Sequence, residues 1–153
     1  AFKAQLFSEI SDHVKTSERK GLKPAIRLNG TSDIAWELVF PDLFTTFNNV
    51  IFYDYTKYPI NKRTRIPANY DLTFSRSETN HEEVIKSLDG GRRVAVVFDT
   101  KRGEELPKQY LNRPVVDGDL HDMRFLDPTN VIVGLRAKGS GKNDQSNFVV
   151  TIN

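Results

Sequence analysis

The stretch Arg93-Val-Ala-Val-Val-Phe98 decides the fold of this 153-residue chain. After Arg93, five apolar residues follow one another without a polar break, and the β-branched valines favour extended backbone. A strand with one face in water alternates apolar and polar residues, whereas an unbroken apolar run is typical of a strand buried on both faces of a parallel sheet. Residues 93–98 therefore predict a central strand of an α/β fold.

Strand and helix patterns alternate on both sides of this run. Further strands are expected where apolar and β-branched residues cluster, at 24–29, 50–55, 70–75, 114–116, 131–135 and, as a last addition, 148–152. Helices are expected where apolar residues recur every fourth position or follow capping residues, at 2–20, around Trp36, from Pro41 and from 80 to 89. Residues 138–146, with two glycines and mixed charges, predict a loop.

This alternation predicts right-handed β-α-β crossovers and a mainly parallel sheet of about five to six strands with flanking helices. Either an open twisted sheet or part of a TIM-like barrel fits that count. The length predicts a single α/β domain over residues 1–153. Because the chain opens at Ala1 inside a helical pattern, two alternatives stand: the C-terminal part of a longer protein, or ordinary processing.

Composition excludes several kinds of site. The chain has no cysteine, so it holds no disulfide, no thiolate nucleophile and no Cys-ligated zinc or iron-sulfur cluster by its own residues. A formal net charge of +2 does not by itself require a polyanionic partner. No apolar run approaches the roughly 20 residues of a membrane span, so we expect no membrane association and a cytoplasmic location, the host cytosol if the protein is phage-encoded.

Polar residues gather where the predicted strands end, and parallel α/β folds bind ligands at the carboxyl ends of their strands. We therefore predict a ligand-binding rim of ten residues: Arg27, Asn29, Asp33, Asp54, Lys57, Ser75, Arg76, Glu78, Asp117 and Asp119. The strand at 93–98 likewise delivers Asp99, Lys101 and Arg102. The alternative is that these residues serve as turn and capping residues of solvated loops.

The run Asp117-Gly-Asp-Leu-His-Asp122 is the densest acidic cluster of the chain. Asp117, Asp119 and His121 offer oxygen and nitrogen ligands that a divalent cation accepts. The run lacks the later ligands of an EF-hand, and a turn centred on Asp-Gly is the alternative.

One predicted loop combines basic and aromatic residues. Lys57, Lys62, Arg63 and Arg65 lie there with two tyrosines, Tyr55 and Tyr58, beside them. Cations interleaved with aromatic rings neutralise phosphates and stack bases, so the loop predicts nucleic-acid binding, with an ordinary solvated loop as the alternative.

Catalytic motifs are missing from the sequence. It contains no Walker loop, G-x-G-x-x-G, G-x-S-x-G or H-E-x-x-H. The three histidines, at 13, 81 and 121, form no His-x-His pair of the kind that a rolling-circle nicking enzyme uses. Whether the protein is an enzyme is left open by these residues.

Several blocks together resemble a known family. They are Ala25-Ile-Arg-Leu-Asn-Gly-Thr-Ser-Asp33, Phe52-Tyr-Asp-Tyr-Thr-Lys57, Leu72-Thr-Phe-Ser-Arg-Ser-Glu78, Val115-Val-Asp-Gly-Asp119, and Arg124-Phe-Leu-Asp-Pro128 through Val131-Ile-Val-Gly-Leu135. In this order and spacing they resemble an uncharacterised family of bacteriophage and mobile-element proteins. The resemblance covers nearly the whole chain.

The resemblance implies that this region is the C-terminal part of longer members, whose upstream Cys-rich segment is similar to radical-SAM enzymes. Three hypotheses follow: a phage protein acting on nucleic acid in replication or modification, the substrate-binding half of a radical-SAM-like barrel enzyme, or a non-catalytic interaction domain. The partner is then nucleic acid, the missing upstream segment, or a second copy in a homo-oligomer. No cofactor is identified beyond the divalent cation considered above.

Overall fold

The computed structural model describes residues 1–152 and contains four α-helices, seven strands and three short 3-10 helices in that range. The α-helices are α1 Phe2–Arg19, α2 Trp36–Val39, α3 Pro41–Thr46 and α4 His81–Asp89. The strands are β1 Ala25–Arg27, β2 Ile51–Thr56, β3 Tyr70–Ser75, β4 Val94–Phe98, β5 Gln109–Tyr110, β6 Arg113–Asp117 and β7 Ile132–Arg136. The 3-10 helices are η1 Ile60–Lys62, η2 Arg124–Leu126 and η3 Gly139–Asn143.

The strands form an open, mostly parallel sheet in the order β1-β2-β3-β4-β7-β6-β5. This confirms the α/β class and the open-sheet alternative. A TIM-like barrel places consecutive strands side by side, whereas here β7 lies between β4 and β6 and the sheet ends in β1 and β5. The partial-barrel alternative is therefore wrong. The chain divides into two compact units, unit 1 with residues 1–54 and 64–71, and unit 2 with residues 55–63 and those from 72 onward.

Unit 1 has an aromatic core. The Phe44 ring stacks on Tyr70 at 4.8 Å between centroids and meets Phe52 edge-on at 5.1 Å. The side-chain amide of Asn69 donates to the backbone carbonyls of Phe44, Phe47 and Val50 at 3.1–3.2 Å. The carbonyls of Phe44 and Phe47 lie at the end of α3, where the last carbonyls have no partner within the helix, and Val50 directly precedes β2. The loop before β3 is thereby tied to α3.

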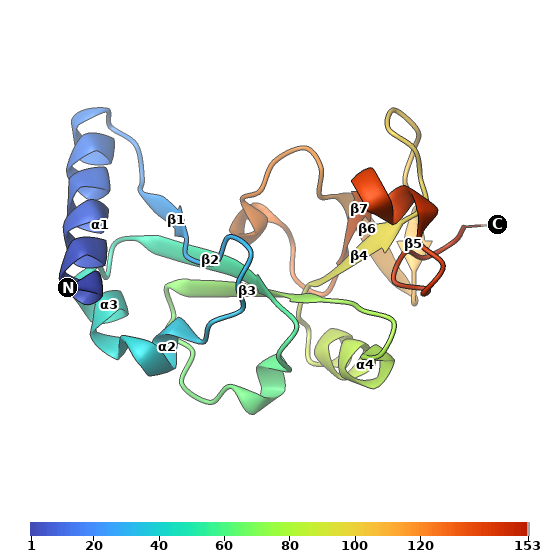
Figure 1. The fold of residues 1–153 in the computed structure, drawn as a ribbon, viewed down its shortest axis with the longest axis horizontal. Coiled ribbons are helices and arrows are strands. Elements are labelled where there is room, and N and C mark those ends of the chain that lie inside the picture. The colour runs from blue at the N-terminus through green and yellow to red at the C-terminus, as the bar shows by residue number, and fades with distance from the viewer. Residues whose placement is uncertain (153) are drawn as a thin grey trace. The chain divides into compact units, whose positions relative to one another are not determined.

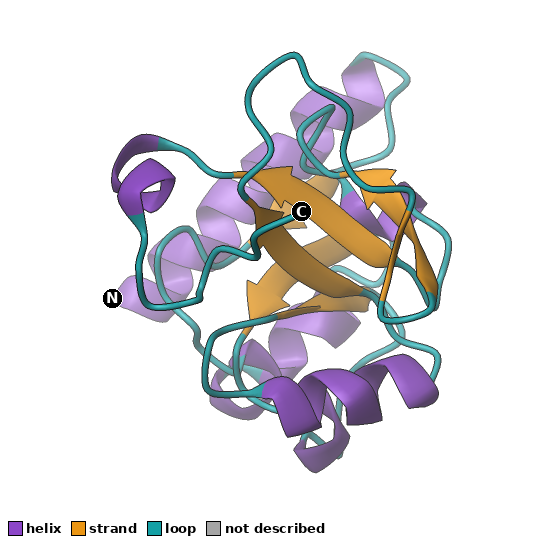
Figure 2. Cartoon of the chain, turned by 90° about the vertical axis from the view of Figure 1, so that its right-hand side faces the viewer, coloured by secondary structure: helices purple, strands orange, loops and turns teal. Residues whose placement is uncertain are grey.

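Unit 2 is built on the pair β4 and β7. The two strands are parallel over five residues, from Val94 opposite Ile132 to Phe98 opposite Arg136. The predicted central strand is confirmed, since Val94, Val96 and Phe98 are fully buried. Helix α4 lies beside β4 (Figure 1), and Figure 2 looks onto these twisted strands and the loops at their ends. Because β4, β7 and β6 of unit 2 are parallel, their carboxyl ends lie at the same edge of the sheet.

The edges of unit 2 differ from the sequence-based expectation. Strand β5 was not expected, and it pairs antiparallel with β6 across a turn in which Leu111 and Asn112 have φ of 50° and 59°. In the last predicted strand, at 148–152, Val150 pairs with Phe98 as an isolated bridge. The expected loop at 138–146 contains η3. Among residues 1–152, no helix is long and apolar enough to cross a membrane.

A buried arginine anchors the loop between β6 and β7. Arg124 is 1% exposed, its guanidinium donates to the carbonyl of His121, and its Nε lies 3.3 Å from Asp127 Oδ2. Arg93 donates from the other side to the carbonyl of Arg124 and, at 3.3 Å, to that of Asp127. The His121 carbonyl and the Asp127 carboxylate lie beside the buried guanidinium and offset part of its desolvation cost, while Nε and Nη1 of Arg124 form no hydrogen bond with the described residues. Gly118, which directly follows β6, has no side chain that would collide with the Arg124 guanidinium.

The replacement Gly118→Ala should destabilise the fold. A Cβ at residue 118 would meet Arg124 Nη1 and Val133 Cγ1 at 2.6 Å and Leu135 Cδ2 at 2.8 Å. Overpacking of this kind costs about 1–3 kcal/mol, to be measured as the change in free energy of unfolding in urea. Gly30→Ala is the control, because a Cβ there meets nothing within 4 Å. Equal effects of the two replacements would contradict the close packing at Gly118.

Candidate functional site

Two cavities lie at the carboxyl ends of β4 and β7 in unit 2. The Phe148 cavity, of about 660 Å³, is lined by Phe148 together with residues of β4 and β7 and of the loops that follow β2, β3, β6 and β7. The Lys101 cavity, of about 570 Å³, is lined by Lys101 with other residues of 99–102, 137–144 and 149–151. Ala137, Gly141, Asp144 and Val149 line both, so the cavities share a wall. Their volumes lie in the range of small-molecule sites.

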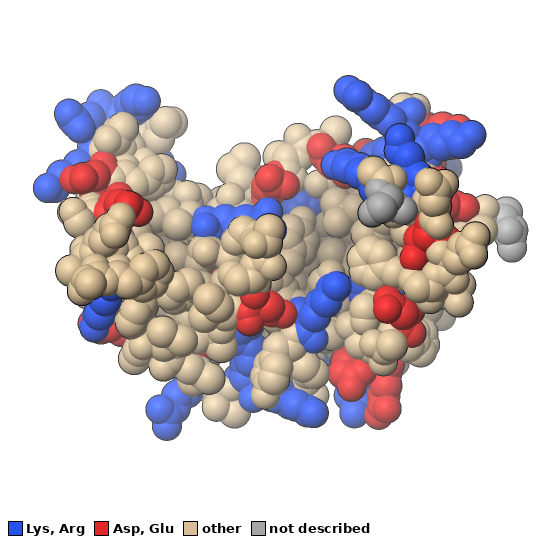
Figure 3. All heavy atoms as spheres, in the orientation of Figure 1, with Lys and Arg blue, Asp and Glu red and all other residues tan. Residues whose placement is uncertain are grey.

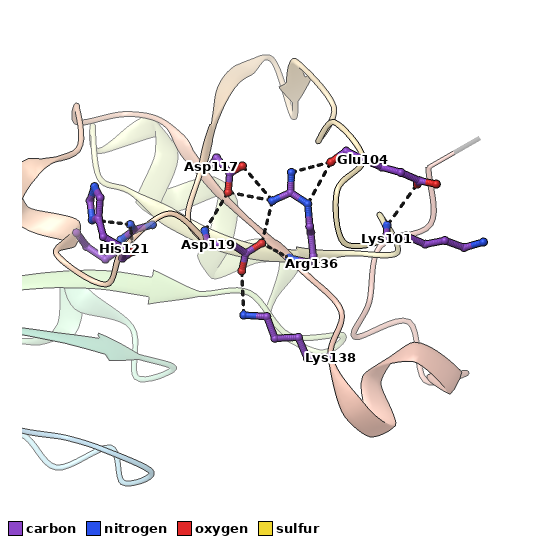
Figure 4. Close-up of polar contacts among 8 residues, drawn as sticks. Lys101, Glu104, Asp117, Asp119, His121, Arg136 and Lys138 are labelled. Carbon is purple, nitrogen blue, oxygen red and sulfur yellow. Dashed lines mark hydrogen bonds and ion pairs between the residues drawn. The ribbon is translucent and has the colours of Figure 1, made fainter.

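Arg136, the last residue of β7, occupies the acidic cluster at the end of β6 (Figure 4). Its Nη1 lies 3.0 Å from both carboxylate oxygens of Asp117 and from Asp119 Oδ2. Its backbone N–H donates to Asp119 Oδ2 at 3.0 Å, and its Nε and Nη2 donate to the carbonyl of Glu104. Lys138 Nζ lies 3.2 Å from Asp119 Oδ1. Both aspartates are therefore neutralised by basic residues of β7 and the segment after it.

These contacts fix the charge state of the cluster. Burial acts to raise the pKa of Asp119, but hydrogen bonds from the Arg136 backbone and guanidinium, and from Lys138, outweigh it and lower the pKa. For Arg136, burial acts to lower the pKa, and the hydrogen bonds to Asp117 and Asp119 reverse this and raise it. Asp119 is thus ionised in the folded protein over a wider pH range than an exposed aspartate.

The structure does not bring Asp117, Asp119 and His121 together as ligands. His121 lies apart from the two aspartates in Figure 4, and its Nδ1 is 3.2 Å from the Met123 backbone N and 3.3 Å from Arg124 Nη2. Within residues 1–152, no group of three His, Asp or Glu side chains is placed to hold a metal ion.

Three predicted rim residues, Lys57, Glu78 and Asp119, meet at the Phe148 cavity. The Lys57 ammonium lies 5.1 Å from the centre of the Phe148 ring, within cation–π range. Arg76, also predicted to bind a ligand, instead donates through Nη1 to the carbonyls of Asn147 and Phe148 at 3.0 and 2.6 Å. Arg76 therefore holds the segment that carries Phe148. The backbone carbonyl of Ser75 accepts from the Asn80 amide at 3.0 Å.

The other predicted rim residues lie in unit 1, around Asn29. The Asn29 side chain is engaged within this loop, because its Oδ1 accepts from Ser32, Ile34 and Trp36 while its Nδ2 donates to Ile34. Arg27 donates to the carbonyls of Asn29 and Gly30 at 2.9 and 3.3 Å, and Asp33 belongs to the same loop. Their contacts organise the loop after β1.

Asp54 supports this loop from β2. It is 2% exposed, and its two oxygens accept from the Asn29 backbone N–H at 2.7 Å and from the Tyr70 hydroxyl at 2.5 Å. Burial raises the pKa of Asp54, while the hydrogen bonds from Tyr70 and Asn29 partly offset that effect. Asp54 and Asn29 thus act as buried scaffold residues of unit 1.

The predicted basic loop is divided by the fold. Arg63 is 8% exposed and donates to Thr56 Oγ1 at 3.4 Å, so its guanidinium is not a surface cation. Lys62 is exposed at the end of η1 in unit 2, whereas Arg65 belongs to unit 1. Lys57 faces Phe148, as described above.

The sequence patterns missed four residues that shape the two cavities: Arg136, Lys138, Lys142 and Phe148. Their common signal is position, since all follow or end the predicted strand at 131–135. Residues 138–146 were predicted as a loop and Phe148 as the start of a last strand, so neither pattern indicated a site after residue 135.

The chain was compared with known proteins. A family model described as "Gene product 88" matches residues 1–152. No match was found among curated proteins or among solved structures.

Replacing Asp119 by Asn should make stability depend less on pH. The folded-state pKa lies below the ordinary value of about 3.9, so the ionised carboxylate stabilises the fold above that value, and this contribution is lost as the pH falls through the folded pKa. We expect Asp119→Asn to cost roughly 1–2 kcal/mol at pH 7 and less at pH 3, measured by urea unfolding.

Asp122→Asn is the control, because Asp122 is an exposed aspartate in the same loop. A difference between wild type and Asp119→Asn that stays constant from pH 7 to pH 3 would contradict the assigned contacts.

Proposed function

The chain belongs to the Gene product 88 family, a family of phage gene products whose model spans residues 1–152, and from this premise we propose that unit 2 binds nucleic acid. The membership confirms the resemblance to an uncharacterised phage family. The proposal covers a role in replication or in nucleic-acid modification in the host cytosol, because both require a surface that holds the phosphate backbone.

The observation that carries the proposal is the set of cations in the Lys101 cavity. Lys101 and Arg102 follow β4, and Lys142 comes from η3, so residues distant in sequence line the same cavity. All three are exposed, and within the described part of the chain their charged groups form no ion pair or hydrogen bond. Thr100 and Thr151 add hydroxyl groups to the wall. Cations and hydroxyls are the usual partners of phosphate oxygens.

The acidic residues of this cavity are already engaged. Asp99 Oδ1 accepts from the Ile152 backbone N–H at 3.1 Å. Asp144 accepts from the Ser146 hydroxyl and from the backbone N–H groups of Ser146 and Val149. These hydrogen bonds, the one from the Ser146 hydroxyl first, lower the pKa of Asp144. These hydrogen bonds hold the two carboxylates in the loop, where they keep their negative charge, so the cavity carries three cations against two anions and retains a positive balance.

The surface of unit 2 around the Lys101 cavity carries charges of both signs. In Figure 3, Lys and Arg side chains lie beside Asp and Glu over the loops around β4 and β6. Part of that positive charge is neutralised, as that of Arg136 and Lys138 is by Asp117 and Asp119. A strongly basic face would bind any polyanion, whereas three unpaired cations beside a cavity suit a few phosphates of a strand. The strand order, with β7 between β4 and β6, does not support the barrel geometry of the radical-SAM-like alternative.

The combined replacement Lys101→Gln, Arg102→Gln and Lys142→Gln should weaken binding of a fluorescent 20-nucleotide DNA strand about tenfold or more at low salt. Each cation that contacts a phosphate contributes about 0.7 to the slope of log K against log salt for single strands, so the slope should fall by about 2. Fluorescence anisotropy at several salt concentrations measures both quantities.

The matched control is Lys86→Gln, Arg92→Gln and Lys108→Gln, which removes the same charge from exposed positions of unit 2 outside both cavities. We expect this variant to bind nearly as wild type. Wild-type protein that does not bind DNA or RNA, or equal loss in the two triple variants, would overturn the proposal.

A further inference from the structure

The Phe148 cavity has an apolar floor that the sheet leaves partly uncovered. Val97 of β4 and Leu135 of β7 are paired in register and line the cavity together, with Val149 at its wall. All three are half-buried, whereas Val96 and Phe98 on the same strand are fully buried. Apolar surface of this kind gains free energy when a flat apolar group covers it.

The wall of the cavity offers an aromatic ring held in a fixed position. Phe148 is half-buried, and its ring is contacted by the Lys57 ammonium at 5.1 Å. The backbone on either side of it is tied down, because Arg76 donates to the carbonyls of Asn147 and Phe148 and Asp144 accepts from the Val149 N–H. A ring that is ordered beforehand loses little entropy when it stacks on a ligand.

The rim of the cavity is polar, and of its two acids outside the ion-pair cluster, Asp144 is engaged by Ser146 and the Val149 N–H. Glu78 is exposed, and its carboxylate forms no ion pair or hydrogen bond with the residues described from 1 to 152. A carboxylate accepts hydrogen bonds from exocyclic amino groups such as those of cytosine. An apolar floor, an aromatic wall and one free acceptor together suit a nucleobase.

From this geometry we infer that the Phe148 cavity takes an unpaired base of a single strand whose phosphates lie at the Lys101 cavity. The inference rests on the proposed function, because it requires the phosphates of the same strand to lie in the Lys101 cavity, which shares a wall with the Phe148 cavity. A base in a duplex is stacked and paired, so it reaches such a cavity only after extrusion from the helix. Unit 2 therefore binds single strands in preference to duplex.

The test compares Phe148→Leu with Phe148→Tyr, since leucine keeps apolar volume and tyrosine keeps the ring. Stacking on an aromatic side chain contributes enough affinity that its loss weakens binding roughly tenfold. We expect Phe148→Leu to show this loss for a 20-nucleotide single strand at unchanged salt slope, with Phe148→Tyr close to wild type. Thermal unfolding of both variants shows that they fold.

An abasic strand of the same length, which keeps the phosphates and lacks the bases, separates the inference from the proposed function. Wild type and Phe148→Leu should bind this strand equally. The two proteins should also have the same affinity for duplex DNA. Equal binding of base-bearing single strands by wild type and Phe148→Leu overturns the base site while the salt-dependent binding stands. Failure of wild type to bind any strand overturns both.

Discussion

The parallel pairing of β4 with β7 is the constraint on which the rest of unit 2 depends. It buries Val94, Val96 and Phe98 against Ile132 and Val133, and it sets the register that ends both strands at one edge. Since β7 also pairs with β6 from Val115 opposite Ile132 to Asp117 opposite Gly134, the ends of three strands meet there. Only glycine fits at 134, where a Cβ would lie 2.7 Å from Val115 Cγ1. This register carries Arg136 to Asp117 and Asp119.

The division of charge at this edge follows from the same register. Asp117 and Asp119 are neutralised by Arg136 and Lys138, and Asp99 and Asp144 accept backbone N–H groups. The Lys101 cavity therefore offers a ligand three cations without an ion pair among the described residues, and the Phe148 cavity offers an apolar floor below a polar rim. A chain of formal net charge +2 can thus present a local anion site without a basic face.

The fold was largely predictable because its signals are local. The unbroken apolar run at 93–98 predicted β4, and the four-residue spacing of apolar side chains predicted α1. Strand β5 was missed because its turn places Leu111 and Asn112 at positive φ without a glycine to mark it. The position of β7 between β4 and β6 depends on long-range pairing, which no local pattern reveals.

The site was less predictable than the fold, because its chemistry depends on partners distant in sequence. Lys57, Glu78 and Asp119 were expected at strand ends and do line one cavity. Asp117 and Asp119 suggested a metal site, since nothing near them in sequence shows that Arg136 binds both. Asn29 and Asp54 suggested a ligand site, yet buried hydrogen bonds within unit 1 engage them.

The most direct test of the central claim, that unit 2 binds a nucleic-acid strand at the carboxyl edge of β4 and β7, is photocrosslinking with single-stranded DNA that carries 5-iodouracil. Peptide mapping by mass spectrometry then identifies the attached residues. The account predicts attachment within the segment from Leu135 to Thr151, with Phe148 as the main acceptor. Attachment confined to α4 or to unit 1 would contradict it.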